Sequence, residues 1–201
     1  MNRLTLLALA SLLLAACSQS APGGERPPLE SGIEVRFPPA PTDAFLSLLT
    51  EGGESVYQVR VDAGKTSVSV DGSKWASQSA KALPLLDFLP GDAGPAGVSA
   101  EGIKANFLHW VMWQDKNSDG KRDSGETLDL MTHDRVVYVS QNAEVKFSTP
   151  DTVQVWKFTQ GWSRAEHYVY LPKGSSTYQR SLTSSGLQRY ELHVPTPVTS
   201  Q

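Results

Sequence analysis

The chain has 201 residues, and its 18 Lys and Arg residues are outnumbered by 21 Asp and Glu residues, which gives a formal net charge of −3 at pH 7. Nothing in this balance suggests the clustered basic face that nucleic-acid binding requires, so we expect no nucleic-acid partner. Its single cysteine, Cys17, excludes an intrachain disulfide, although a chain of this length can bury a core without one.

The first residues of the chain have the pattern of an export signal. Arg3 supplies a positive charge, and residues 4–14 are apolar except for Thr5 and Ser11. This run is too short to span a bilayer, which takes about 20 residues. Small residues precede Cys17, which stands at the expected cleavage position. The alternative is an ordinary secretory signal in which the cysteine has no role.

The segment resembles the lipobox of bacterial lipoproteins. The resemblance implies that residues 1–16 are removed as a signal peptide and that the thiol of Cys17 is diacylglycerylated. Two or three acyl chains would anchor the protein stably, so we expect the membrane as a partner and the bacterial cell envelope, outside the cytoplasm, as the location. Ser18 in place of Asp resembles sorting to the outer membrane.

The remaining chain divides by composition. Residues 17–31 are rich in Gly and Pro with almost no apolar content, which predicts a flexible tether after the lipidated cysteine. We predict a β-rich exported domain over residues 32–194. The Gly- and Pro-containing stretch 91–102 is a candidate boundary within it, and residues 195–201 are predicted to be a tail.

Alternation of apolar and polar residues with period 2 dominates the predicted domain. It predicts strands over residues 33–37, 56–61, 66–70, 135–139, 144–147, 153–158, 167–171 and 187–194, and residues 62–65 are predicted to be a hairpin turn. Apolar residues on both faces of residues 103–113 favour a buried strand. Two segments are helix candidates, residues 43–50 and residues 80–89, the second beginning at Pro84. The pattern predicts an antiparallel β-sandwich, Ig-like or barrel-like, with one or two short helices.

Residues 115–126, with the sequence DKNSDGKRDSGE, have the spacing of a calcium-binding loop. Oxygen-bearing side chains stand at loop positions 1, 3, 5, 9 and 12, and Gly120 stands at position 6, where a sharp turn is needed. The predicted Ca²⁺ ligands are Asp115, Asn117, Asp119, Lys121 through its carbonyl, Asp123 and Glu126. An exposed turn rich in Asp, Asn and Gly is the alternative interpretation.

The loop resembles the EF-hand-like loops of bacterial surface and exported proteins, including dockerin-type repeats and calcium-binding β-sandwich modules of adhesins. This resemblance covers residues 111–130. The segment 127–130 alternates between apolar and polar residues and is too short to be the second helix of an EF-hand. We therefore expect the loop to join two strands. Three cationic residues inside the loop predict weak affinity, about 10⁻⁴–10⁻³ M.

Other chemistry has less support in the sequence. The four histidines, at positions 109, 133, 167 and 193, lack the spacing of a zinc motif. Neither G-x-S-x-G nor S-x-x-K occurs, and we predict no catalytic residue. The late aromatic residues are predicted to form one face of the core, with an exposed binding platform as the alternative; they are Trp156, Phe158, Trp162, Tyr168, Tyr170, Tyr178 and Tyr190.

The sequence therefore predicts a lipid-anchored envelope protein with one structural Ca²⁺ site, which acts as a binding or assembly module for a protein or glycan. The alternative is a lipid-anchored, calcium-stabilised hydrolase acting on glycans or peptides, which needs a cleft with two carboxylates or a His–carboxylate pair. An inhibitor or chaperone-like module is a third interpretation, and it would show an exposed apolar patch or an open sheet edge.

Overall fold

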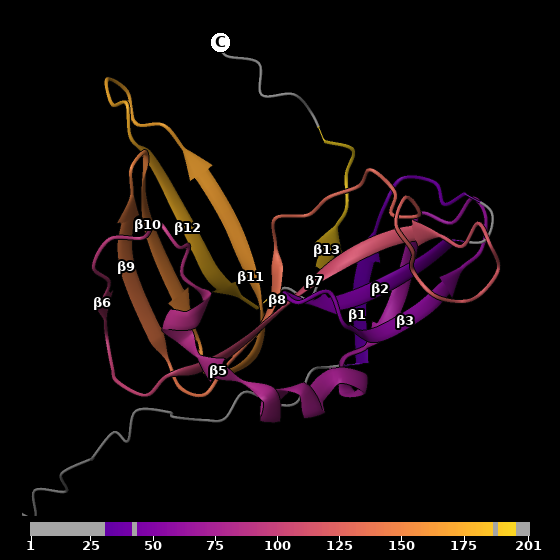
Figure 1. Ribbon diagram of the computed structural model, residues 1–201, viewed down its shortest axis with the longest axis horizontal. Coiled ribbons are helices and arrows are strands. Elements are labelled where there is room, and N and C mark those ends of the chain that lie inside the picture. Colours follow the sequence, from indigo (N-terminus) through magenta and orange to yellow (C-terminus); the bar gives the residue numbers. More distant parts are fainter. Residues whose placement is uncertain (1–30, 42–43, 187–188, 196–201) are drawn as a thin grey trace, which may run out of the picture.

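The computed structural model describes residues 31–41, 44–186 and 189–195, and these residues are mostly in strands (Figure 1). The predicted signal peptide, Cys17 and most of the tether and tail lie outside the described residues. The strands are β1 (Ser31–Arg36), β2 (Ala44–Thr50), β3 (Ser55–Val61), β4 (Ser67–Asp71), β5 (Leu83–Pro84), β6 (Gly97–Val98), β7 (Lys104–Gln114), β8 (Arg135–Val139), β9 (Ala143–Thr149), β10 (Thr152–Phe158), β11 (Gly161–Tyr170), β12 (Tyr178–Ser185) and β13 (Arg189–Glu191).

The strands form two sheets. A small sheet has the order β13-β1-β4, and a ten-stranded sheet has the order β3-β2-β7-β8-β11-β12-β10-β9-β6, with β5 paired to β7. Most neighbours are antiparallel, but β1 pairs with β13 and β10 with β12 in parallel. The predicted β-sheet class is confirmed, and the large sheet stays open between β3 and β6.

Strand β7 joins the two halves of the molecule (Figure 1). Its later residues pair with β2, whereas Ala105 to Leu108 pair with β8. Side chains alternate across a strand, so its two faces serve different cores. Phe107 is buried in one cluster, and Trp110 and Met112 are buried in the other. The large sheet therefore has a hydrophobic core on each of its faces.

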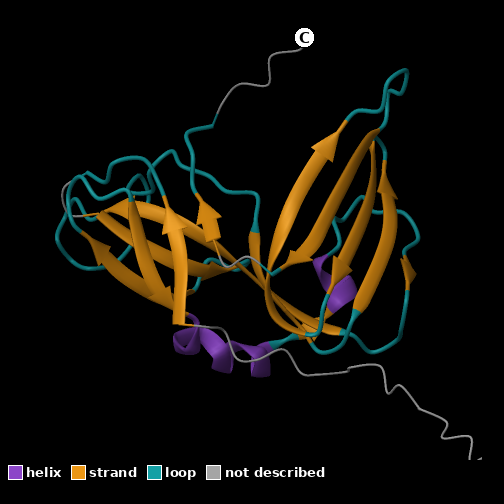
Figure 2. Ribbon diagram, turned by 180° about the vertical axis from the view of Figure 1, so that it is seen from behind, coloured by secondary structure: helices purple, strands orange, loops and turns teal. Residues whose placement is uncertain are grey.

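The first core lies between the small sheet and strands β2 and β7. Trp75 and Trp110 meet edge to face at its centre, with ring centroids 5.7 Å apart. The second core lies on the other face, between β7, β8 and strands β9 to β12. Phe107, Trp156 and Phe158 are in mutual ring contact there. Figure 2 shows the two halves from behind, on either side of the crossing strands.

The predicted helix over residues 43–50 is wrong, because Ala44–Thr50 forms strand β2. This strand lies between β3 and β7 and is buried on both faces. Leu46 and Leu48 pack in the first core, while Ser47 and Leu49 are buried on the opposite face. A strand covered on both sides loses the period-2 pattern, and its continuous apolar run resembles a helix segment.

The second helix candidate, residues 80–89, is only partly right. The longer helix is a 3₁₀ helix, η1 (Gly72–Lys81), which begins where Asp71 accepts a hydrogen bond from the backbone N–H of Ser73 at 2.9 Å. A second 3₁₀ segment, η2 (Leu85–Phe88), begins directly after Pro84. The described residues contain no helix long and apolar enough to cross a membrane.

The turn over residues 62–65 forms, but its two strands do not pair. The backbone N–H of Lys65 donates to the carbonyl of Asp62 at 3.2 Å, and Gly64 has a φ of +77°. Strand β3 then pairs with β2 in the large sheet, while β4 pairs with β1 in the small sheet. The predicted hairpin is therefore a connection between sheets. The candidate boundary over residues 91–102 connects η2 to β7 and includes β6, which pairs with β9.

Candidate functional site

The predicted calcium loop leaves β7 and returns to it. The backbone N–H of Gln114 donates to the carbonyl of Glu126 at 2.9 Å, and that of Leu128 donates to Met112 at 2.9 Å. The chain then continues to β8, so the loop joins two strands as predicted. A bridge between Trp113 and Thr127 closes its base.

Trp113 anchors the base of the loop to the core through its contacts. Its side chain is fully buried, and its ring stacks on Phe45 with centroids 4.7 Å apart and planes at 18°. Its indole N–H donates to the Ser47 hydroxyl at 2.9 Å. The loop is thus fixed to the central strand β2 two residues before its first predicted ligand.

Inside the loop, the side chains at positions 1, 3 and 5 accept hydrogen bonds from backbone N–H groups of the loop itself. The carboxylate of Asp115 accepts from the N–H groups of Asp119 at 3.1 Å and Gly120 at 2.9 Å. Asn117 also accepts from Asp119 at 3.1 Å, and Asp119 accepts from Lys121 at 2.8 Å. Gly120 has a φ of +75°, the conformation in which glycine is favoured.

Glu126 closes the loop. Only 4% of its surface is exposed, and its two carboxylate oxygens accept from the backbone N–H groups of Lys116 and Asp123, each at 2.9 Å. The amide of Asn117 donates to the carboxylate of Asp123 at 3.0 Å. Loop positions 3, 9 and 12 are therefore connected across the loop.

The donor chemistry of the loop fits a hard cation, because every predicted ligand offers oxygen. In the described residues, however, no group of three His, Cys, Asp or Glu side chains is arranged to hold a metal ion. The carboxylates of the loop accept hydrogen bonds from its own N–H groups. To bind a cation, their oxygens would have to move closer to one another. Calcium binding at residues 115–126 therefore remains a prediction.

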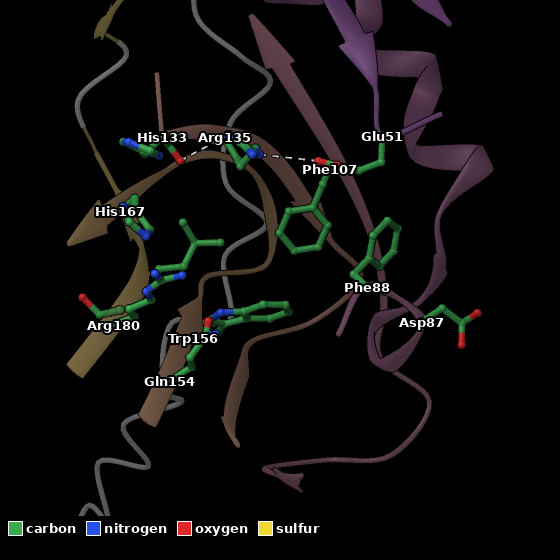
Figure 3. Close-up of a pocket in the computed structure, with 12 residues that line it drawn as sticks. Glu51, Asp87, Phe88, Phe107, His133, Arg135, Gln154, Trp156, His167 and Arg180 are labelled. Atoms are coloured by element: carbon green, nitrogen blue, oxygen red, sulfur yellow. Dashed lines mark hydrogen bonds and ion pairs between the residues drawn. The ribbon is translucent and has the colours of Figure 1, made fainter. Parts of the chain in front are cut away.

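A cavity of about 390 Å³, which sequence reasoning missed, is lined by residues from both halves of the molecule (Figure 3). Such a volume lies within the range of small-molecule sites. Its lining residues come from the turn after β2, from η2 and β7, from the segment before β8 and the start of β8, and from β10 to β12; they are Glu51, Asp87, Phe88, Phe107, His133, Arg135, Gln154, Trp156, His167, Arg180, Ser181 and Leu182.

One wall of the cavity is aromatic. The rings of Phe88 and Phe107 lie 4.8 Å apart, and Phe107 lies 5.8 Å from Trp156. Phe107 and Trp156 belong to the second core, with exposed fractions of 5% and 8%. The wall is therefore the exposed edge of a packed cluster, which makes it a preformed apolar surface.

The opposite wall is polar and basic. Arg135 forms an ion pair with Glu51 at 3.4 Å and donates to the carbonyl of His133 at 3.3 Å. Arg180 extends toward His167 (Figure 3) and has no ion-pair partner among the residues that the structure describes. The guanidinium group of Arg135 is thus neutralised by Glu51, whereas that of Arg180 can pair with a ligand.

Three of the four histidines, which are far apart in the sequence, come together beside the cavity, and two of them, His133 and His167, line it. The ring of His133 lies 5.0 Å from that of His167 and 6.4 Å from that of His193. An antiparallel bridge between Met131 and His193 brings the last of these alongside. The proximity arises from pairing between distant segments, so motif spacing could not have shown it.

The surroundings of both cavity imidazoles lower the pKa and favour the neutral ring at pH 7. Burial lowers the pKa of His167 from 6.5 to about 4, and His133 and Arg180 add to the effect. Burial also lowers the pKa of His133, with further contributions from His193 and Arg135. The carboxylate of Asp134 acts against both shifts. Each neutral ring then offers one N–H donor and one acceptor.

Asp134, the carboxylate that acts on both imidazoles, has structural contacts of its own. Asp134 accepts from the backbone N–H of His167 at 3.1 Å and lies 3.7 Å from the guanidinium of Arg164. Arg164 is largely buried and also contacts Glu166 and the carbonyl of Arg189. Asp134 therefore holds β11 and β8 together.

Some of the aromatic residues late in the sequence lie in the core and others are exposed, so each of the two interpretations, a core face and an exposed platform, holds for part of them. Trp156, Phe158 and Tyr190 are buried in the cores, as predicted. Tyr168 and Tyr170, by contrast, are 64% and 51% exposed, with ring centroids 5.9 Å apart. The exposed pair lies near the end of β11.

Comparison of the chain with protein-family models, with curated proteins and with solved structures found no match.

Proposed function

We propose that this chain is a lipid-anchored binding module of the bacterial cell envelope, that the cavity between its two halves is the ligand site, and that the loop over residues 115–126 binds one structural Ca²⁺ ion. The cavity is the observation behind the binding role. Preformed aromatic surface faces a small number of convergent polar groups, among them Arg180 and two neutral imidazoles, and this combination is typical of a small-molecule site.

The proposed role of calcium follows from the place of the loop in the fold. The loop is an extension of β7, the strand that contributes side chains to both cores. A cation that binds only the folded loop stabilises the whole fold by mass action. At about ten times Kd the gain is about 1.4 kcal/mol, which would favour folding where Ca²⁺ is plentiful, outside the cytoplasm.

The binding role is tested by filling the cavity. Gln154 lines the cavity and is only partly buried, so Gln154→Trp should fill the space without disturbing the cores. We expect compounds from a panel of sugars, amino acids, nucleotides, short peptides and aromatic acids to raise the Tm of the wild type by several degrees, and not that of the variant. The measurement is differential scanning fluorimetry.

Gln179→Trp is the matched control for this experiment. Gln179 precedes Arg180 and therefore lies on the opposite face of β12. Its variant should respond to ligands as the wild type does. Equal responses of the wild type and Gln154→Trp to every active compound would show that the cavity is not the ligand site.

A further inference from the structure

The charges around the cavity sum to zero but are unevenly placed. Four charged side chains line it, namely Glu51, Asp87, Arg135 and Arg180. Glu51 and Arg135 neutralise each other through their ion pair at 3.4 Å. Asp87 lies on η2 and is directed away from the basic wall (Figure 3). The basic wall is therefore left with the positive charge of Arg180.

Neighbouring groups add donors to this charge. The neutral rings of His133 and His167, 5.0 Å apart, each supply an N–H group beside the guanidinium. A guanidinium with five N–H donors matches the planar or tetrahedral oxygens of carboxylate, sulfonate and phosphate groups. The polar wall is therefore complementary to an anion, and a cation would be repelled by Arg180.

Across the cavity, the surface is apolar and flat. Phe88, Phe107 and Trp156 form a continuous aromatic row there. Aromatic rings favour stacked or edge-to-face contacts with other rings, which add to the gain from buried area. An inorganic anion alone would leave this wall without a contact.

We infer that the cavity binds a small organic anion with a flat apolar body, whose charged group contacts Arg180, His133 and His167 and whose body lies against Phe107 and Trp156. This inference rests on the proposed function, because it names the ligand class of the same cavity.

Three probes separate the two parts of the inference. Naphthalene-2-sulfonate has both the ring and the charge, naphthalene-2-sulfonamide has the ring without the charge, and methanesulfonate has the charge without the ring. The experiment is calorimetric titration at pH 7 of the full chain in phosphatidylcholine nanodiscs, with empty nanodiscs as the blank. We expect naphthalene-2-sulfonate to bind at least about tenfold more tightly than either of the others. The sulfonamide lacks the charge-assisted contact, which contributes about that much. Methanesulfonate lacks the ring and therefore the gain from buried apolar area.

Two variants test whether the charged group of the probe binds at Arg180. Arg180→Gln should weaken naphthalene-2-sulfonate by about tenfold or more and leave the sulfonamide unchanged. Lys65→Gln removes the same charge from the exposed turn between β3 and β4, and it should bind all three probes as the wild type does.

The possible failures differ. Equal affinity for the sulfonate and the sulfonamide, unchanged by Arg180→Gln, would overturn the anionic class while keeping a binding cavity. Equal affinity for methanesulfonate and naphthalene-2-sulfonate would overturn the apolar body. If none of the three probes binds, the inferred ligand class is wrong, and the panel tested with Gln154→Trp then decides whether the cavity binds any ligand.

Discussion

The imidazole of His167 is kept neutral by its surroundings, and this has a consequence for stability. Its pKa is about 4 in the folded protein, chiefly because of burial, whereas the ordinary value is 6.5. His133, Arg180 and Arg135 face it and favour the neutral form, while Asp134 favours the charged form. Between these two pKa values the unfolded chain binds more protons than the folded one. The titration of His167 therefore does not reduce the free energy of unfolding above about pH 6.5, and it reduces that free energy progressively as the pH is lowered toward 4.

His167→Gln should remove part of this pH dependence. We expect the Tm of the wild type to fall by a few degrees more between pH 7 and pH 5 than that of the variant, measured by calorimetry. Tyr168→Phe, on the opposite face of β11, is the control and should behave as the wild type. Parallel decreases in the wild type and His167→Gln would show that this imidazole does not contribute to the acid sensitivity.

The loop over residues 115–126 is the element whose function the sequence predicts most directly. Its buried Glu126 accepts two backbone N–H bonds, and as a ligand it would also contribute both oxygens to Ca²⁺. Glu126→Gln removes the charge and keeps the shape. In saturating Ca²⁺ the wild type should gain about 1.4 kcal/mol or more over a chelator, or about 3–6 °C in Tm, and the variant should gain little.

The readout for the loop is the difference in Tm between calcium and chelator, because Glu126→Gln also weakens two backbone contacts without the ion. Glu101→Gln, an exposed carboxylate elsewhere, should keep the full calcium response. Tb³⁺ luminescence sensitised by the buried Trp113, next to the loop, reports occupancy independently. A calcium response that Glu126→Gln leaves intact would place the ion elsewhere.

Sequence patterns predicted β7, β8 and β10 closely but missed β2 and β12. Strand β8 was predicted to the residue, and β10 and β7 to within one residue at each end, because their apolar residues mark the core. Strand β12 was missed because only Leu182 is buried in it, so no alternation is visible. The cavity was missed because the fold alone brings its lining together: Glu51, η2 and β7 are distant in sequence from β10 to β12.

At the scale of the whole molecule, β7 makes the two halves interdependent. Phe107 forms part of the cavity wall and the second core, and five residues later Met112 packs in the first core and binds the strand that returns from the loop. A calcium ion at the loop and a ligand in the cavity would therefore act on the same strand. Both would stabilise the same folded state, because each binds only when β7 is in place.

The proposed lipid anchor at Cys17 would determine where this molecule works, and it leads to a prediction about the mature protein. A single acyl chain holds a protein only marginally, whereas the two or three chains of a lipidated Cys17 would hold it stably. Mass spectrometry of the chain recovered from bacterial membranes should therefore find an N-terminal peptide that begins at Cys17 and has a diacylglyceryl group on sulfur. Cys17→Ser should lack the lipid and leave the cavity intact, so its affinity for naphthalene-2-sulfonate should equal that of the wild type. An unmodified N-terminal peptide from the wild type would leave the binding module without an anchor, and its place in the envelope would have to be explained by another partner.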